Sequence, residues 1–323
     1  MRTLTPVLSL ALLAPLALSQ PVLAQNFPTK PVRIILGFTP GGGVDINARL
    51  AAPKLTEILG QQVIIENKPG AGTNIANEFV AKAAPDGYTV LMTTAAVAIN
   101  MSLYKKVNYD ALRDFAPVGM FSASPNVLVV SASLPAKNVA EFLALARSQP
   151  GKLNFSSAGA GTTQHLSGEL LNTLAKIKVA HIPYKGSAPA LTAVISGEVQ
   201  LSFANIPAIS GHVKSGKMRA LALTGGRRND QLPDVPTLKE SGVNMDVEVW
   251  YGVFAPAATP RAIVNRLSDA FAKTAHAPEI SKRLLELGAE PRGMNADDFT
   301  KLFRAEVATW ADVVKASGAT ADE

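Results

Sequence analysis

The chain of 323 residues contains no cysteine, which excludes disulfides, thiol catalysis and cysteine metal sites. Its 31 Lys and Arg residues are dispersed, with no run longer than Arg227-Arg228, and its few aromatic residues do not alternate with them, which excludes nucleic acid as a partner. The net charge of +6 favours an anionic ligand. The four histidines show no metal-ligand spacing, so we expect neither a metal nor a cofactor.

The first 24 residues have the pattern of an export signal. Arg2 is the only charge before residue 25, an apolar stretch runs from Val7 to Leu18, and Val22-Leu23-Ala24 fits a signal peptidase site. A membrane anchor is disfavoured, because a spanning helix needs about 20 apolar residues and this stretch is shorter. We expect a signal peptide over 1–24, cleavage after Ala24 and a mature protein in the periplasm.

Strand-like and helix-like segments alternate along the rest of the chain. The expected strands are 32–36, 63–65, 88–92, 116–121, 125–130, 152–156, 179–182, 199–203, 219–224 and 247–255. The expected helices are 73–83, 138–147, 162–174, 187–196, 206–215 and 261–274. A first helix is indicated by apolar spacing from Ile46 to Leu59, with a kink or a late start at Pro53, and a last one by the apolar face from Phe299 to Val314. This alternation predicts α/β lobes with mostly parallel sheets.

About 300 mature residues exceed one ordinary hydrophobic core, so we expect two lobes. Two long strand-like stretches, near 117–130 and 247–256, are candidates for two chain crossings between them. One lobe then holds 25–123 plus 250–323, and the other holds 124–249.

A glycine-rich segment, 38–45, joins the first strand to the first helix. Glycines allow backbone N–H groups to approach a ligand, and a helix N-terminus carries unpaired N–H donors with a partial positive charge. Together they form an anion site without a charged side chain. A tight turn, with Asp45 as the N-cap, explains the same residues equally well. The candidate ligand-binding residues are Phe38, Pro40, Gly41, Gly42, Gly43 and Asp45.

A second segment of this kind, 156–165, follows the strand at 152–156 and opens the helix at 162–174. A Ser/Thr-rich helix cap is the alternative interpretation. Because ligands of open α/β sheets bind beyond the carboxyl ends of strands, two such segments in two lobes favour a shared cleft. The candidate ligand-binding residues here are Ser157, Ala158, Gly159, Thr162, Thr163 and His165.

Two further strand ends supply candidates. Tyr184 and Lys185 follow the strand at 179–182, where Tyr184 can stack or donate and Lys185 is either a counter-ion or a solvated side chain. Asn205 follows the strand at 199–203, where its amide either faces the ligand or caps a helix.

A catalytic alternative pairs Ser157 as a nucleophile with His165 as its base. No acid partner is identifiable, and the sequence has no G-x-S-x-G motif. We therefore expect a binding protein and not an enzyme.

Several segments in order resemble one family. They are 27–33, 40–45, 66–72, 84–88, 114–118, 184–186, 232–237 and 250–252. This set is similar to the periplasmic solute-binding proteins of tripartite tricarboxylate transporters, the Bug receptors. Two positions differ from the common pattern: Ala204 stands where many members have an acid, which argues against an amine-bearing ligand, and Val44 replaces a common Thr.

The resemblance implies a two-lobed, type 2-like Venus-flytrap fold with a small carboxylate in the cleft, held by backbone N–H groups and waters. The segments 38–45 and 157–165 match the family's ligand-binding loops. We therefore predict a monomeric receptor that delivers a small carboxylate to transporter subunits in the cytoplasmic membrane. The alternative is a sensor that presents the ligand to a membrane histidine kinase.

Overall fold

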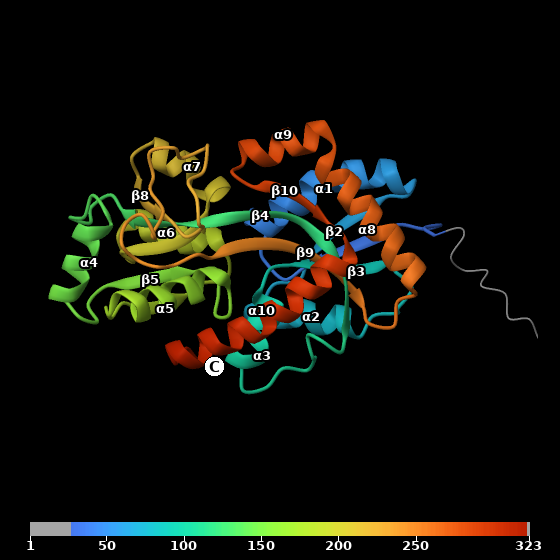
Figure 1. Cartoon of the computed structure of the whole chain (residues 1–323), viewed down its shortest axis with the longest axis horizontal. Coiled ribbons are helices and arrows are strands. Elements are labelled where there is room, and N and C mark those ends of the chain that lie inside the picture. The colour runs from blue at the N-terminus through green and yellow to red at the C-terminus, as the bar shows by residue number, and fades with distance from the viewer. Residues whose placement is uncertain (1–26, 322–323) are drawn as a thin grey trace, which may run out of the picture.

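Two long strands, β4 (Phe115–Ser131) and β9 (Glu248–Pro256), run along the middle of the computed structural model in Figure 1. The structure describes residues 27–321, and the expected signal peptide over 1–24 lies outside them. Helices and shorter strands gather at both ends of this pair, so the protein has two lobes. No helix within residues 27–321 is long and apolar enough to cross a membrane.

The first lobe is built on β1 (Val32–Leu36), which pairs in parallel with β2 (Val63–Asn67) and β3 (Thr89–Thr93). Alternate side chains of β1 enter two separate cores: Ile34 faces one side of the sheet and Ile35 the other. The helices on the Ile34 side are α1 (Gly43–Leu59), α8 (Arg261–His276) and α9 (Pro278–Glu286). Those on the Ile35 side are α2 (Asn74–Ala81), α3 (Ala96–Leu103) and α10 (Ala296–Ser317).

The second lobe is built on β5 (Asn154–Ser157), which pairs in parallel with β6 (Ala180–Pro183) and β7 (Leu201–Asn205). β8 (Met218–Leu223) completes this sheet. Its helices are α4 (Val139–Ser148), α5 (Thr163–Ala175), α6 (Ser187–Ser196) and α7 (Ile206–Lys214).

β4 belongs to both sheets. Its first part pairs antiparallel with β9, from Phe115 opposite Pro256 to Pro125 opposite Glu248, and its second part pairs antiparallel with β7 and β8. The two strands expected at 116–121 and 125–130 are therefore one. The prediction of mostly parallel sheets is wrong at the centre, because one strand leaves the first lobe and the other returns, so they must run in opposite directions.

Other expectations also need correction. α1 begins at Gly43 and continues past Pro53, so a late start of this helix is wrong. α3, α9 and β10 (Glu290–Met294) were not expected from the sequence. α3 is buried on nearly all sides and lacks the polar face that reveals an amphipathic helix. β10 contains Pro291 and Gly293 and pairs irregularly with β4.

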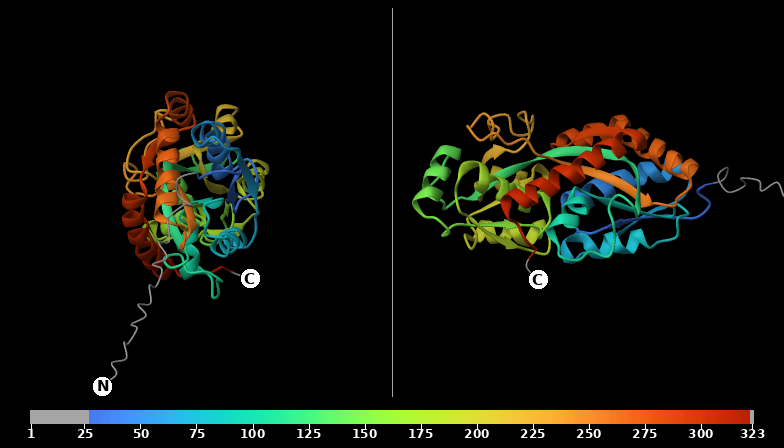
Figure 2. Two further views of the ribbon diagram at one scale, coloured as in Figure 1. Left: turned by 90° about the vertical axis from the view of Figure 1, so that its right-hand side faces the viewer. Right: turned by 60° about the horizontal axis from the view of Figure 1, so that its bottom comes forward.

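The last helix, α10, has the apolar face that its spacing predicts. It packs on α3 of the first lobe and also on α5 of the second, and it lies across the middle of the molecule in the right-hand view of Figure 2. Phe303 of α10 is 1% exposed, and its ring centroid lies 4.8 Å from that of Phe254 on β9. Trp250 and Phe299 complete this aromatic cluster.

We expect Phe303→Ala to lower the free energy of unfolding by about 3–5 kcal/mol, because it leaves a cavity in the aromatic cluster. Urea unfolding at constant pH measures the change. The matched control is Phe79→Ala, since Phe79 is 37% exposed, and this variant should lose about 1 kcal/mol or less. Equal losses in the two variants would contradict the role of the cluster.

Candidate ligand-binding site

Two neighbouring chambers, which share the lining residues Phe38, Thr39, Ala158 and Thr162, lie between the lobes. The inner chamber has a volume of about 30 Å³ and the outer chamber one of about 370 Å³. The inner chamber is lined by Phe38, Thr39, Gly42, Gly43, Val44, Thr94, Asn126, Ala158, Thr162, Thr163, Gln164, Ser187, Asn205, Val249 and Tyr251. The outer chamber is lined by Gly37, Phe38, Thr39, Pro69–Thr73, Ala158, Gly159, Thr162, Tyr184, Lys185 and Gly186. Together they reach the size of small-molecule sites, about 300–1,000 Å³.

Four helices begin at the inner chamber. The N-cap residues of α1, α5 and α7 line it, namely Gly42, Thr162 and Asn205, and α6 begins with the lining residue Ser187. The first N–H groups of a helix have no partner within the helix and carry a partial positive charge. The chamber therefore offers donors from both lobes to an anion.

Glycine allows α1 to approach the opposite lobe this closely. A Cβ atom on Gly43 would collide with the amide of Asn205 and the hydroxyl of Tyr251. The absence of a side chain at Gly43 brings the first turn of α1 against the floor of the chamber, where its N–H groups can reach a ligand.

Charged side chains avoid this cleft. In the part of the chain that the structure describes, no Asp, Glu, Lys or Arg lines the inner chamber, and Lys185 alone lines the outer one. Lys185 is exposed. No group of three or more His, Asp or Glu side chains in residues 27–321 is placed to hold a metal ion. To an anion, the inner chamber therefore offers backbone N–H groups, hydroxyls and amides.

Two buried amides face the inner chamber. Asn126 on β4 is 1% exposed, and neither its Oδ1 nor its Nδ2 has a hydrogen-bond partner among residues 27–321. Asn205 is 5% exposed and donates from Nδ2 to the Tyr251 hydroxyl at 3.3 Å. Buried polar groups are normally hydrogen-bonded, so these amides mark a place that a polar molecule completes.

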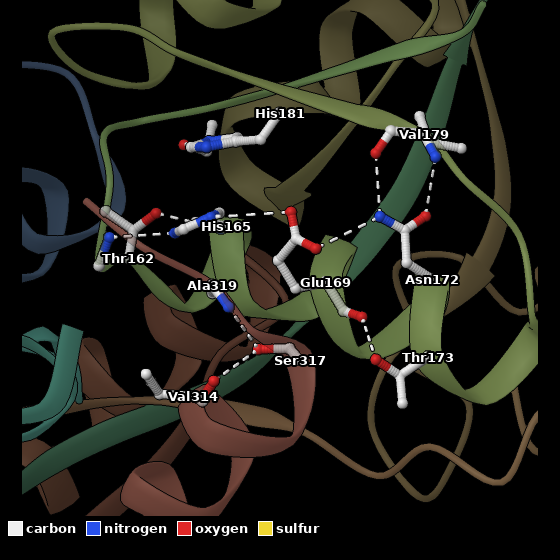
Figure 3. Close-up of polar contacts among 12 residues, drawn as sticks. Thr162, His165, Glu169, Asn172, Thr173, Val179, His181, Val314, Ser317 and Ala319 are labelled. Atoms are coloured by element: carbon white, nitrogen blue, oxygen red, sulfur yellow. Dashed lines mark hydrogen bonds and ion pairs between the residues drawn. The ribbon is translucent and has the colours of Figure 1, made fainter. Parts of the chain in front are cut away.

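A stack of two histidine rings supports the loop before α5 from behind. His165 and His181 lie 3.8 Å apart between ring centroids, with an interplanar angle of 16°. His181 Nε2 lies 2.7 Å from the Ser157 hydroxyl, and His165 Nδ1 accepts a hydrogen bond from the Gly161 N–H at 3.2 Å. Figure 3 shows His165 between Thr162 and Glu169, with His181 beside it. The histidines therefore fix the loop backbone.

The charge state of this stack follows from its burial. Burial, and to a smaller extent the neighbouring His165, lower the pKa of His181 to about 3. Burial also raises the pKa of Glu169, whose Oε1 lies 3.8 Å from His165 Nε2. Because His165 Nδ1 accepts a hydrogen bond, that nitrogen carries no proton, and His181 stays neutral at pH 7.

The chambers bring together ten of the fifteen candidate residues from the sequence: Phe38, Gly42, Gly43, Ala158, Gly159, Thr162, Thr163, Tyr184, Lys185 and Asn205. The other five lie outside the lining. Pro40 and Gly41 are exposed before α1, and Asp45, Ser157 and His165 are buried behind the two loops. These buried residues support the loops that form the cleft.

The capping role expected for Asp45 is wrong. The N-cap of α1 is Gly42, and the Asp45 carboxylate accepts hydrogen bonds from the Gly41 N–H at 3.0 Å and from Arg49 at 2.9 Å. Burial acts to raise its pKa, but hydrogen bonds from Arg49, Gly41 and Asn67 outweigh burial, so the pKa is lowered. Asn205 does occupy an N-cap position, but its side chain makes no capping hydrogen bond.

The catalytic pairing of Ser157 with His165 is also wrong. The Ser157 hydroxyl contacts His181 instead, and it is wholly buried, donating to the Gly159 carbonyl oxygen at 3.0 Å. A nucleophile must reach its substrate, and Ser157 lines neither chamber.

Sequence reasoning missed the floor of the chamber. Asn126, Val249 and Tyr251 come from the crossing strands, and Thr94 precedes α3. A polar residue in the apolar run 125–130 was the available signal for Asn126. Its position in the cleft depends on tertiary structure, because β4 and β7 place Asn126 opposite Asn205.

Two α/β lobes joined by two crossing strands, with a cleft of helix N-termini between them, define a periplasmic binding protein of the Venus-flytrap type. The chain matches the model of the tripartite tricarboxylate transporter family receptor over residues 47–319. It is 33% identical over 310 residues to Protein BugT of Bordetella pertussis, with 95% of each chain covered. The chain belongs to the tripartite tricarboxylate transporter receptor family.

Two solved structures are similar over nearly their whole length. An R. palustris protein with adipate has a TM-score of 0.87 and 37% identity, covering 91% of this chain and 99% of that chain. MatC from Rhodopseudomonas palustris with bound malate has a TM-score of 0.84 and 33% identity, covering 89% of this chain and 100% of that chain.

The pKa of His181 predicts a pH dependence of stability. The pKa of His181 is 6.5 in the unfolded chain and about 3 in the folded protein. At a pH between these two values, the unfolded chain binds a proton at His181 that the folded protein does not. The free energy of unfolding therefore falls as the pH drops through this window, by up to about 1.4 kcal/mol per pH unit. Urea unfolding at pH 7 and pH 5 measures the loss.

In the His181→Gln variant, which keeps a hydrogen-bonding group at this position, the loss between pH 7 and pH 5 should be smaller than in the wild type. The control His212→Gln changes a partly exposed histidine of α7 and should behave as the wild type does. The assignment is contradicted if His181→Gln retains the full pH dependence.

Proposed function

We propose that this receptor binds a small carboxylate in the cleft and delivers it to transporter subunits in the cytoplasmic membrane. The observation that carries this proposal is the convergence of four helix N-termini on a chamber without charged side chains. The adipate and malate complexes of similar proteins support a carboxylate as the ligand class.

The energetics of such a site are sufficient for tight binding. A carboxylate that leaves water needs several hydrogen-bond donors in return. Hydrogen bonds to a charged group contribute roughly 1.5–3 kcal/mol each, and a micromolar Kd corresponds to about 8 kcal/mol. About four donors shared between the starts of α1 and α5 reach this value after the cost of closing the lobes.

The lobes divide best at the crossing strands. We place the first lobe at 25–123 plus 250–323 and the second at 124–249, because β4 passes from pairing with β9 to pairing with β7 after Pro125. Rotation about these strands opens the cleft.

The protein acts as a monomer. It carries out no enzymatic turnover, since the Ser157 hydroxyl is buried. The sensor alternative, which presents the ligand to a membrane histidine kinase, uses the same site.

We expect Gly42→Val to weaken carboxylate binding at least about tenfold, or 1.4 kcal/mol, without unfolding the protein. Gly42 has an extended backbone that valine can adopt, and an added Cβ lies 3.8 Å from the Thr39 carbonyl oxygen and 3.9 Å from the Ser187 hydroxyl. The Cβ atom therefore fits, and the methyl groups of valine add bulk at the inner chamber, which Gly42 lines. Calorimetry with a carboxylate selected by thermal shift measures the Kd.

The matched control is Gly211→Val on α7, where no heavy atom lies within 4 Å of an added Cβ. It should bind as the wild type does. Unchanged binding by Gly42→Val, together with loss of binding in Lys185→Ala, would replace the backbone mechanism with a side-chain counter-ion. Failure of every carboxylate in the screen to bind would overturn the proposed function.

We further propose export with cleavage after Ala24. Expression in a Gram-negative host should yield a periplasmic protein whose intact mass starts at Gln25. A mass that retains residues 1–24 would contradict cleavage.

A further inference from the structure

The floor of the inner chamber is formed in part by the amide of Asn126. Its side chain is 1% exposed and lines the chamber, and both of its polar atoms lack a partner within the described chain. A buried group left without its hydrogen bond costs about 1–3 kcal/mol. The molecule that enters this chamber is therefore expected to satisfy a donor and an acceptor at the same place.

An amide and a carboxylate are not fully complementary. An ionised carboxylate only accepts hydrogen bonds, so it suits the N–H groups of the helix starts and the Nδ2 of Asn126. It offers no hydrogen to Oδ1. Because both ends of the amide are unpaired, turning the Asn126 side chain over leaves one acceptor without a donor in either orientation. A second ligand group, close to the carboxylate, can supply this donor.

Within the described residues, the absence of acidic side chains around the chambers decides whether this donor is a charged ammonium or a neutral hydroxyl. An ammonium group donates, but it carries a positive charge, and no Asp or Glu side chain of residues 27–321 lines either chamber. The buried carboxylate nearest in sequence to the α1 start, Asp45, is already engaged by Arg49 and lies outside the lining. A buried charge without a counter-ion is costly. A hydroxyl group donates and accepts without charge.

We propose that Asn126 is a specificity-determining residue that selects carboxylates bearing a hydroxyl on the adjacent carbon. The carboxylate faces the starts of α1 and α5, and the hydroxyl exchanges hydrogen bonds with the Asn126 amide. Asn205, which faces Asn126 in the strand register, has an unpaired Oδ1 that offers a second acceptor to the same hydroxyl. This inference rests on the proposed function and names the ligand class within it.

Matched pairs of acids that differ only in this hydroxyl test the inference. The pairs are malate and succinate, 2-hydroxyadipate and adipate, and mandelate and phenylacetate, each titrated into the mature protein by calorimetry. In every pair that binds, the hydroxy acid should bind at least about tenfold tighter, or 1.4 kcal/mol. Aspartate, which places an ammonium at the hydroxyl position of malate, should bind more weakly than malate.

Two substitutions test the residue itself. Asn126→Leu should reduce the hydroxy-to-deoxy affinity ratio to within about threefold, because leucine neither donates nor accepts. Asn126→Asp introduces a counter-ion, so it should raise the affinity for aspartate relative to malate. If Asn126→Leu fails to fold, the affinity of Asn126→Asp for aspartate relative to malate still tests the role of the residue. The control Asn108→Leu makes the same change at an exposed site and should leave all ratios unchanged.

The outcomes separate the two proposals. Equal affinities within a pair that binds, or an unchanged ratio in Asn126→Leu, overturn the role of Asn126 and leave the carboxylate receptor intact. Absence of binding by every carboxylate, these pairs included, overturns the proposed function and this inference with it.

Discussion

The hydrogen-bonded ladder between β4 and β9 is the interaction on which the cleft depends. It runs from Phe115 opposite Pro256 to Pro125 opposite Glu248, and its two strands carry the chain from one lobe to the other. The same two strands supply part of the chamber floor through Asn126, Val249 and Tyr251. The floor and the proposed hinge thus lie on the same two strands, so the proposed rotation would move the loops above the ligand more than the floor beneath it. The proposed specificity residue, Asn126, lies on a crossing strand, whereas the helix starts that face the ligand lie on the lobes.

The second constraint is the burial of an anion without a cation. A lysine or arginine in the inner chamber would need its own counter-charge whenever the ligand is absent. Helix N–H groups avoid this cost, because their partial charges are fixed by the fold and need no ion pair. This requirement accounts for the glycine at Gly43 and for a neutral His181 behind the second loop, since a charged His181 in contact with Ser157 would demand hydration there. The loops are therefore held in place by uncharged contacts.

The sequence predicted the local elements well, because apolar spacing and turn residues act over short distances. Residues 32–36 and 187–196 match β1 and α6 at both ends. The two segments 38–45 and 156–165, singled out from glycine and hydroxyl residues at strand ends, both contribute to the lining of the chambers. The direction of the crossing strands and the role of Asn126 were not predicted, because both depend on pairing between segments far apart in the chain, such as Asn126 with Asn205. The expectation that Asp45 caps α1 was wrong for a related reason: its carboxylate accepts hydrogen bonds from Arg49 and Asn67 instead.

The C-terminal helix adds a last constraint on motion. α10 packs on α3 in the first lobe and on α5 in the second, and α5 begins at the ligand loop. Leu170 and Thr173 of α5 and Val313 of α10 line one groove between these helices. Opening the cleft must either break this contact or keep it near the rotation axis. α10 also packs on β4, beside the crossing strands about which we propose that the lobes rotate. Any opening of the cleft by that rotation therefore involves the contact between α10 and α5.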